Sequence, residues 1–173
     1  MLDPIWVELS HLKPNSFTPD EAADTFPWAH DFDFRQIEGI TKYMTAFSAC
    51  GGQTLLSEGS DGSFMAIVLS GCVDIVKKDS TGVQKLIARL GPGKVIGEMG
   101  MIDGGKRSAT ATASTNTSVL VLSRNAFENM KQEKPRLALQ VMTSLAKIES
   151  HRLRQTSGKL IELMTEKPRS LFS

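Results

Sequence analysis

The sequence predicts a mostly β fold, a sandwich or jelly-roll barrel, with helices on its flanks. The main observation is a series of short β-type segments, separated by turn signals, between about residues 43 and 122. The second is the stretch from Arg136 to about Glu166, where Gly158 alone departs from a helical pattern. The third is a glycine-rich segment at residues 97–110, which lies between two β-type segments and has the composition of a ligand-binding loop.

The composition limits the class of protein. A chain of 173 residues is long enough for about one domain with a sizeable core, and 40% hydrophobic with 23% charged residues is ordinary for a globular protein. No apolar run approaches the length of a membrane span, and the N-terminus lacks the layout of a signal peptide. Two cysteines provide neither a disulfide framework nor a metal-binding spacing. We therefore expect a cytoplasmic protein that does not contact a membrane.

Residues 1–33 do not fit the β pattern and are predicted to form an acidic N-terminal arm. Residues 1–34 contain seven acidic side chains and one lysine, a net charge of −6. Thr18-Pro-Asp-Glu21 is a capping box with proline at the first helical position, which predicts a helix from Pro19 to about Phe26. Pro4–Leu9 is a candidate strand. The arm is either a solvated terminus or is anchored, on this chain or on an unidentified protein partner, by four aromatic residues: Trp6, Phe17, Phe26 and Trp28.

The predicted alternation of strands and turns begins after a short helix. From Phe34 to Met44 the pattern Phe-x-x-Ile-x-x-Ile predicts a helix that leads into the barrel, which spans about residues 43–122. The expected strands are Tyr43–Ala49, Gln53–Leu56, Ser63–Leu69, Cys72–Lys77, Val83–Leu90, Lys94–Ile96, Ser108–Ala113 and Ser118–Leu122.

Helices are expected over about residues 124–166, with residues 167–173 as a tail. Ser123 is a plausible N-cap for Arg124–Lys131, and Pro135 ends that short helix. A helix of roughly 30 residues would follow and span about 45 Å, which is longer than a small barrel needs. Its second half carries a coiled-coil seam and predicts a homodimer. The residues expected to pack on the barrel are Leu137, Val141, Leu145 and Ile148, and the seam residues are Leu153, Thr156, Leu160 and Leu163.

The glycine-rich segment has the chemistry of a sugar-phosphate site. Its glycines allow backbone amides to approach a ligand, and Glu98–Ile102 is long enough for one helical turn with free N–H groups at its start. Arg107 adds a permanent charge whose fork suits phosphate. Glu98 would repel a bare anion, but its carboxylate can accept a hydrogen bond from a hydroxyl group. A ligand with both a phosphate and a hydroxyl group satisfies both side chains.

Three other interpretations of this region compete. Gly100–Lys106 matches the first positions of a nucleoside-triphosphate loop, but Arg107 stands where Ser or Thr should bind magnesium. That motif must also open a helix, whereas residues 108–113 are predicted as a strand. Gly91–Gly97 is one residue too long for a dinucleotide fingerprint. The third alternative is a glycine-rich surface turn with an incidental arginine.

The segment resembles the phosphate-binding cassette of cyclic nucleotide-binding domains. The usual pattern is Gly-Glu-hydrophobic-Ala-Leu, about four variable residues, and then Pro-Arg-Ala/Ser/Thr-Ala. In this chain Gly100 replaces the usual Ala and Lys106 replaces the frequent Pro. The residues in register are Gly97, Glu98, Met99, Met101, Arg107, Ser108 and Ala109.

This resemblance implies roles for single residues and a domain that spans residues 34–166. Glu98 would bind the ribose 2′-hydroxyl group and Arg107 the cyclic phosphate, while Ser108 and the amides of Gly97–Gly100 would complete the phosphate shell. Residues 152–160 are further similar to the dimer helix of the bacterial catabolite activator family. In that family a Thr-Ser pair meets the adenine, the Thr from its own subunit and the Ser from the neighbouring one. The matching positions are Thr156 and Ser157.

The expected function is therefore a dimeric receptor domain for cyclic AMP, with some binding of cyclic GMP. His11, His30 and His151 lie in three different segments without ligand spacing, so we expect no enzyme, no metal and no cofactor. One alternative is a degenerate domain of this fold that serves as a protein-interaction module. Another is the sensory fragment of a longer transcription regulator. Residues 167–173 are too short for a helix-turn-helix and the net charge is only +1, so no specific nucleic-acid binding is expected from this chain alone.

Overall fold

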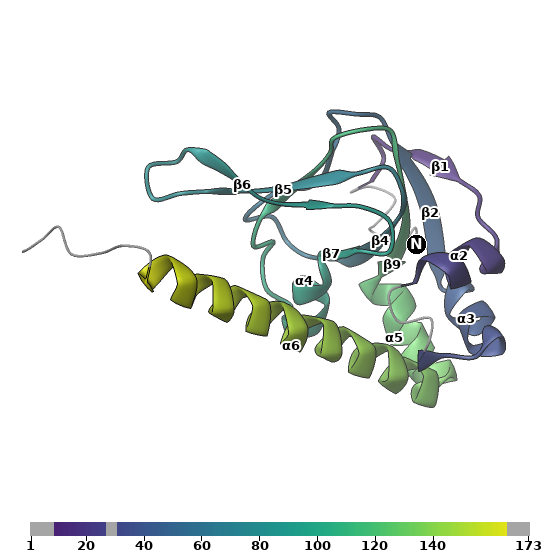
Figure 1. Cartoon of the computed structure of the whole chain (residues 1–173). Coiled ribbons are helices and arrows are strands. Elements are labelled where there is room, and N and C mark those ends of the chain that lie inside the picture. Colours follow the sequence, from purple (N-terminus) through teal and green to yellow (C-terminus); the bar gives the residue numbers. More distant parts are fainter. Residues whose placement is uncertain (1–8, 27–30, 166–173) are drawn as a thin grey trace, which may run out of the picture.

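The computed structural model describes residues 9–26 and 31–165. These residues form two antiparallel β-sheets with helices on one side (Figure 1). The strands are β1 (Lys13–Asn15), β2 (Met44–Ala49), β3 (Thr54–Leu56), β4 (Phe64–Ser70), β5 (Val73–Lys78), β6 (Gln84–Leu90), β7 (Val95–Ile96), β8 (Thr110–Ala113) and β9 (Thr117–Ser123). The helices are α2 (Pro19–Thr25), α3 (Phe34–Thr41), α4 (Glu98–Asp103), α5 (Arg124–Glu133) and α6 (Pro135–Thr165).

The sheets are built from non-consecutive strands. One has the order β1-β2-β9-β4-β7, and the other has the order β3-β8-β5-β6. This arrangement confirms the predicted mostly β class with flanking helices, and each of the eight predicted strands is present with ends shifted by at most two residues. Strand β1 was not predicted, because Lys-Pro-Asn has no apolar alternation. It forms by pairing with β2, with Lys13 opposite Ser48, at a sheet edge where Pro14 is tolerated.

Strands β4 and β9 are buried on both faces because their sheet is the middle layer. Ile67 and Leu120 belong to the core cluster on the helix side, whereas the next residues, Val68 and Val121, belong to the cluster between the two sheets. The continuous apolar runs of these strands follow from this position, since neither face meets water. The chain is therefore layered as helices, first sheet and second sheet.

The described part of the acidic N-terminal segment packs on this chain. Helix α2 has the predicted capping box, in which Thr18 and Glu21 each bind the other's backbone N–H group. Phe26 is buried in the cluster on the helix side, and Phe17 packs against that cluster. Leu9 and Leu12 are buried in the other cluster. Of the four predicted aromatic anchors, Trp6 and Trp28 lie outside the described residues, as does most of the candidate strand Pro4–Leu9.

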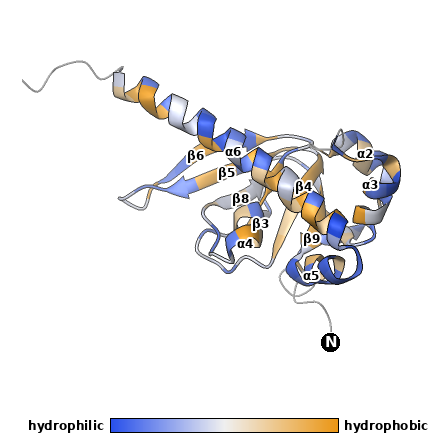
Figure 2. Ribbon diagram, turned by 90° about the horizontal axis from the view of Figure 1, so that it is seen from below, coloured by the Kyte–Doolittle hydropathy of each residue, from blue (hydrophilic) through white to orange (hydrophobic). Residues whose placement is uncertain are grey.

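Helix α6 has a buried first half and an exposed second half. Val141 and Leu145 are buried, and Leu137 and Ile148 pack partly buried against the same cluster, as predicted. Beyond Arg152 the helix leaves the core: Leu153 is 68% exposed and Leu160 is 57% exposed. Figure 2 shows apolar positions continuing along this free part of α6. Within the described ranges, no helix has the length and apolar character needed to cross a bilayer.

Candidate functional site

The cassette is a turn–helix–turn that is bounded by two left-handed glycines. Strand β7 pairs with β4 and ends at Ile96, and the next residue, Gly97, is the N-cap of α4 with a φ of 76°. Helix α4 ends at Asp103, and its C-cap is Gly104, whose φ is 72°. A side chain at Gly97 would collide with the Arg107 guanidinium, so glycine is required there both for conformation and for space.

Gly100 explains the first departure from the usual cassette pattern. A Cβ atom at this position would lie 3.2 Å from the carbonyl oxygen of Gly105 and 3.3 Å from the Cα atom of Gly62. The loop that contains Gly62 therefore packs directly on α4. The Arg124 side chain from α5 donates hydrogen bonds to the carbonyl oxygens of Gly62 and Gly100, which links this loop to α4.

Glu98 is a buried carboxylate with one free oxygen. Glu98 is 4% exposed, and its Oε1 atom accepts a hydrogen bond from the Arg152 guanidinium. Its Oε2 atom is buried and has no hydrogen-bond partner. Burial raises the pKa of Glu98 from 4.5 to about 7, although the positive charge of Arg152 opposes this rise. A buried acceptor without a donor is costly, so this atom is suited to a ligand that brings a donor.

Arg107 is buried beside Glu98 in the same cavity. It is 4% exposed, its Nη1 atom donates to the Gly97 carbonyl oxygen at 2.9 Å, and its guanidinium carbon lies 4.6 Å from the centre of the Phe64 ring. The backbone N–H of Arg107 donates a hydrogen bond to the Ser60 carbonyl oxygen at 2.8 Å. These contacts fix the guanidinium at the base of the cassette, where its permanent positive charge lines the cavity.

Two adjoining cavities meet at this place. The first has a volume of about 280 Å³ and lies between the cassette, the second sheet and α6. The second, of about 680 Å³, lies between the second sheet and α6, and both are lined by Ile75, Ile87 and Arg152. The predicted site residues on the wall of the first cavity are Gly97, Glu98, Met99, Gly100, Arg107, Ser108 and Ala109.

The two predicted site residues on α6, Thr156 and Ser157, do not line the cassette cavity. Thr156 lines the second cavity, next to Gln155 and Lys159. Ser157 lines neither cavity and is exposed on α6. Seven of the predicted residues therefore share one cavity, Thr156 borders the adjoining one, and Ser157 faces away from both within this chain.

Arg152 is a site residue that sequence reasoning missed. Its guanidinium donates to Glu98, to Glu149 Oε1 at 3.0 Å and to the Val95 carbonyl oxygen at 2.7 Å. One side chain thus connects α6 with the cassette and with β7. Its position four residues before Thr156 could have indicated this role, because residues at this spacing lie on the same helix face and Thr156 was predicted to contact the ligand.

The competing nucleotide-loop interpretation fails on the local fold. Helix α4 ends at Asp103, and after Lys106 the chain enters β8 instead of opening a helix. Among the residues that the structure describes, no group of three or more His, Cys, Asp or Glu side chains is arranged to hold a metal ion. His30 lies outside those residues.

Comparisons with known proteins agree with this geometry. Residues 47–134 match the family described as "Cyclic nucleotide-binding domain". The chain is 29% identical over 128 residues to the "CRP-like cAMP-activated global transcriptional regulator" of Mycobacterium tuberculosis, covering 74% of this chain and 55% of that protein. It is 32% identical over 144 residues to the "Cyclic AMP receptor protein" of Thermus thermophilus, covering 83% and 65%. The chain thus spans about half to two thirds of these relatives.

A solved structure matches over nearly the whole chain. It is the cyclic nucleotide-binding domain from Methylobacillus flagellatus, which superimposes with a TM-score of 0.85 at 24% sequence identity and covers 99% of both chains. At this identity the match supports the fold alone.

Proposed function

This chain belongs to the cyclic nucleotide-binding domain family, and we propose that it is a receptor for cyclic AMP that signals through α6. The observation that carries the proposal is the free, buried Oε2 atom of Glu98 in the same cavity as the Arg107 guanidinium. A ribose hydroxyl group supplies the missing donor, and a cyclic phosphate supplies the negative charge that Arg107 and Ser108 can bind. One cavity thus holds the side chains that would bind both groups of one sugar phosphate.

The base would lie toward the second cavity, where Thr156 is on the wall. A hydroxyl group both donates and accepts, so Thr156 can bind the amino edge of adenine. This supports a preference for cyclic AMP with weaker binding of cyclic GMP. Ser157 lines neither cavity of its own chain. In this proposal it would contact the base that is bound by a second copy of the chain.

Arg152 supplies the route from ligand to helix. The ribose hydroxyl group and Arg152 would share the Glu98 carboxylate, so ligand binding changes the strength of the bond between α4 and α6. Any such difference between the free and the bound chain shifts the position or order of α6. A coupling free energy of about 1–3 kcal/mol is the usual scale.

Isothermal titration calorimetry with cyclic AMP tests the proposal. We expect one site per chain, competition by cyclic GMP at higher concentration, and unchanged cyclic AMP on recovery. Absence of heat and of competition would identify a degenerate domain that serves protein interaction. Recovery of the linear nucleotide would identify a hydrolase. Either result would refute the receptor.

The relatives favour a second candidate for the larger context. The Mycobacterium tuberculosis match is a transcriptional regulator of which this chain covers 55%. The chain would then be the sensory part of a regulator whose DNA-binding module lies elsewhere. A footprinting experiment with this chain alone should show no protection of duplex DNA. Among residues 9–26 and 31–165, the helices are α2 to α6, and no helix-turn-helix follows α6.

A further inference from the structure

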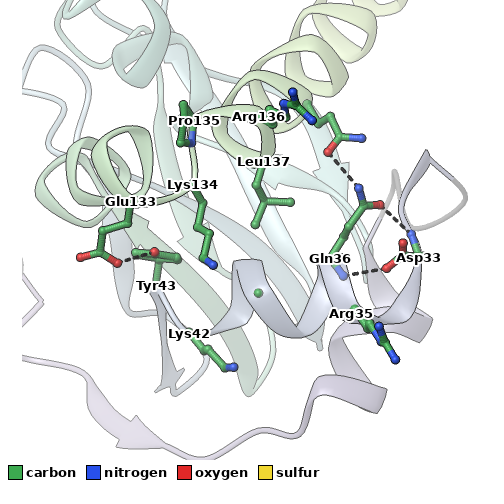
Figure 3. A pocket seen from close by; sticks show the side chains of 12 residues that line it. Asp33, Arg35, Gln36, Lys42, Tyr43, Glu133, Lys134, Pro135, Arg136 and Leu137 are labelled. Atoms are coloured by element: carbon green, nitrogen blue, oxygen red, sulfur yellow. Dashed lines mark hydrogen bonds between the residues drawn. The ribbon is translucent and has the colours of Figure 1, made fainter.

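A third cavity lies at the start of α6, away from the cassette, which α6 contacts near its middle through Arg152. It has a volume of about 580 Å³ and forms where α3 faces the junction of α5 and α6. We call it the α3–α6 hollow (Figure 3). It is lined by Asp33, Arg35, Gln36, Gly39, Lys42, Tyr43, Glu133, Lys134, Pro135, Arg136, Leu137 and Gln140.

The floor of the hollow is apolar. Leu137 points from α6 toward Gly39 on α3, and a Cβ atom at Gly39 would lie 3.2 Å from the Leu137 side chain (Figure 3). Glycine in the interior of a helix is unfavourable, and here it is explained by the close approach of α6. The Pro135 and Tyr43 rings border the same space. Leu137 fills the space beside Gly39, so the floor that another molecule can contact is formed by Leu137, Pro135 and Tyr43.

The rim of the hollow is positively charged. Four basic side chains line it, and its two acidic side chains are already engaged. Asp33 accepts from the backbone N–H of Gln36 at 2.9 Å, and Glu133 accepts from the Tyr43 hydroxyl at 2.6 Å. Of the basic residues, Lys42 forms an ion pair with Glu38 at 3.3 Å. Within the described ranges, three have side chains without a hydrogen bond or ion pair: Arg35, Lys134 and Arg136.

We propose that the α3–α6 hollow docks an acidic peptide segment of a partner protein. One apolar side chain of the segment would pack on the apolar floor beside Leu137, and its carboxylates would bind Arg35, Lys134 and Arg136. A nucleic acid fits less well, because its phosphates could bind the basic rim but would leave the apolar floor uncovered.

This site extends the receptor function without depending on it. Helix α6 begins at the hollow and carries Arg152 to the cassette and Thr156 to the adjoining cavity. A partner bound at the hollow would therefore contact the same helix that the ligand contacts. The partner is a candidate for the protein that receives the signal.

The test uses fluorescence anisotropy without any cyclic nucleotide, so that its outcome is separate from that of the receptor proposal. The probe is a labelled dodecapeptide of alternating Glu and Leu. We expect saturable binding that weakens with salt, and at least tenfold weaker binding by the Lys134→Glu, Arg136→Glu double variant. The matched control is the Lys13→Glu, Lys85→Glu variant, which changes the net charge equally at exposed strand positions. Circular dichroism establishes that both variants are folded.

Two further peptides separate the contributions of charge and apolar contact. Replacing Glu by Gln, or Leu by Ser, should each weaken binding at least tenfold. Equal affinity of either peptide, or of the double variant, overturns the proposal. Displacement of the peptide by inorganic phosphate or a single-stranded oligonucleotide at the same charge concentration overturns it in favour of a general anion site. A salt-sensitive dimer that Lys134→Glu, Arg136→Glu abolishes overturns it in favour of a second copy of this chain.

Discussion

At the scale of single residues, the burial of Glu98 makes the stability of the chain depend on pH. The folded chain holds the Glu98 proton more tightly than the unfolded chain, because burial raises the pKa from 4.5 to about 7. The stabilising contribution of protonation is therefore complete below pH 4.5 and is lost as the pH rises through about 7.

The Glu98→Gln variant isolates this effect. It keeps the shape of the side chain but cannot titrate, so its stability should change less between pH 5 and pH 8 than that of the wild type. The expected difference is on the order of 1–3 kcal/mol and is measured by urea unfolding at each pH. Parallel pH profiles of the two proteins would show that Glu98 titrates as it does in the unfolded chain.

Arg107 should dominate the affinity for a cyclic phosphate. Arg107→Ala removes the buried positive charge and should weaken cyclic AMP binding by several kcal/mol, because the phosphate would be enclosed without a partner. Glu98→Gln should cost less, on the order of 1–3 kcal/mol, because it retains a hydrogen-bond acceptor. Calorimetry measures both. An Arg107→Ala variant with wild-type affinity would exclude this side chain from the site.

Thr156 and Ser157 are the residues that should determine base preference. The double change Thr156→Ala, Ser157→Ala should reduce the ratio of the affinities for cyclic AMP and cyclic GMP, since both hydroxyl groups would be lost. The ratio is obtained by competition calorimetry at one salt concentration. A ratio that does not change would place base recognition on other residues, among which Gln155 and Lys159 line the same cavity.

At the scale of elements, Arg152 should hold α6 against the cassette. Arg152→Gln removes the charged hydrogen bonds to Glu98 and Glu149, so backbone amides of residues 149–156 should exchange about tenfold faster in the free chain. The matched control is Arg154→Gln, because Arg154 lies on the exposed face and donates to Ser150 within the same helix at 2.7 Å. Equal exchange in the two variants would mean that core packing alone holds α6.

The elements predicted correctly from the sequence are those whose ends are determined by residues close to them in the chain. The capping box at Thr18, the N-cap at Ser123 and the glycines around α4 act within a few residues, and all are present in the structure. Strand β1 has no local signal, since it exists only through pairing with β2. Phe34 matched the apolar pattern of α3 and yet is 52% exposed, because the helix presents Ile37 and Ile40 to the core.

The candidate site could be predicted in part for the same reason. The cassette is contiguous in sequence, and its seven predicted residues line one cavity. Arg152 is 54 residues from Glu98, and this contact depends on how α6 crosses the cassette. The α3–α6 hollow likewise joins residues about 100 positions apart, including the hydrogen bond between Gln36 and Gln140 at 3.0 Å. Contacts of this kind arise from tertiary packing, because a sequence can show which residues share a helix face but not what that face meets.

At the scale of the whole molecule, the exposed half of α6 is the strongest reason to expect a symmetric dimer. Helix α6 has 31 residues and its second half leaves the core, with large apolar side chains in water: Leu153, Leu160, Ile161, Leu163 and Met164. A seam of this kind in one helix can pair with the same seam of a second copy about a two-fold axis. The same pairing would bring Ser157 of one copy toward the base held by the other.

Light scattering should therefore give twice the monomer mass, and Leu160→Glu should return the chain to a monomer because it buries a charge in the seam. Leu86→Glu is the matched control, since Leu86 is 58% exposed on β6 and does not belong to α6, and this variant should remain a dimer. If the ligand acts through the seam, cyclic AMP should also slow amide exchange across residues 153–163 in the wild type. A monomer at high micromolar concentration, or exchange in this segment that is indifferent to cyclic AMP, would separate the receptor site from α6 and leave the transmission of the signal to another element.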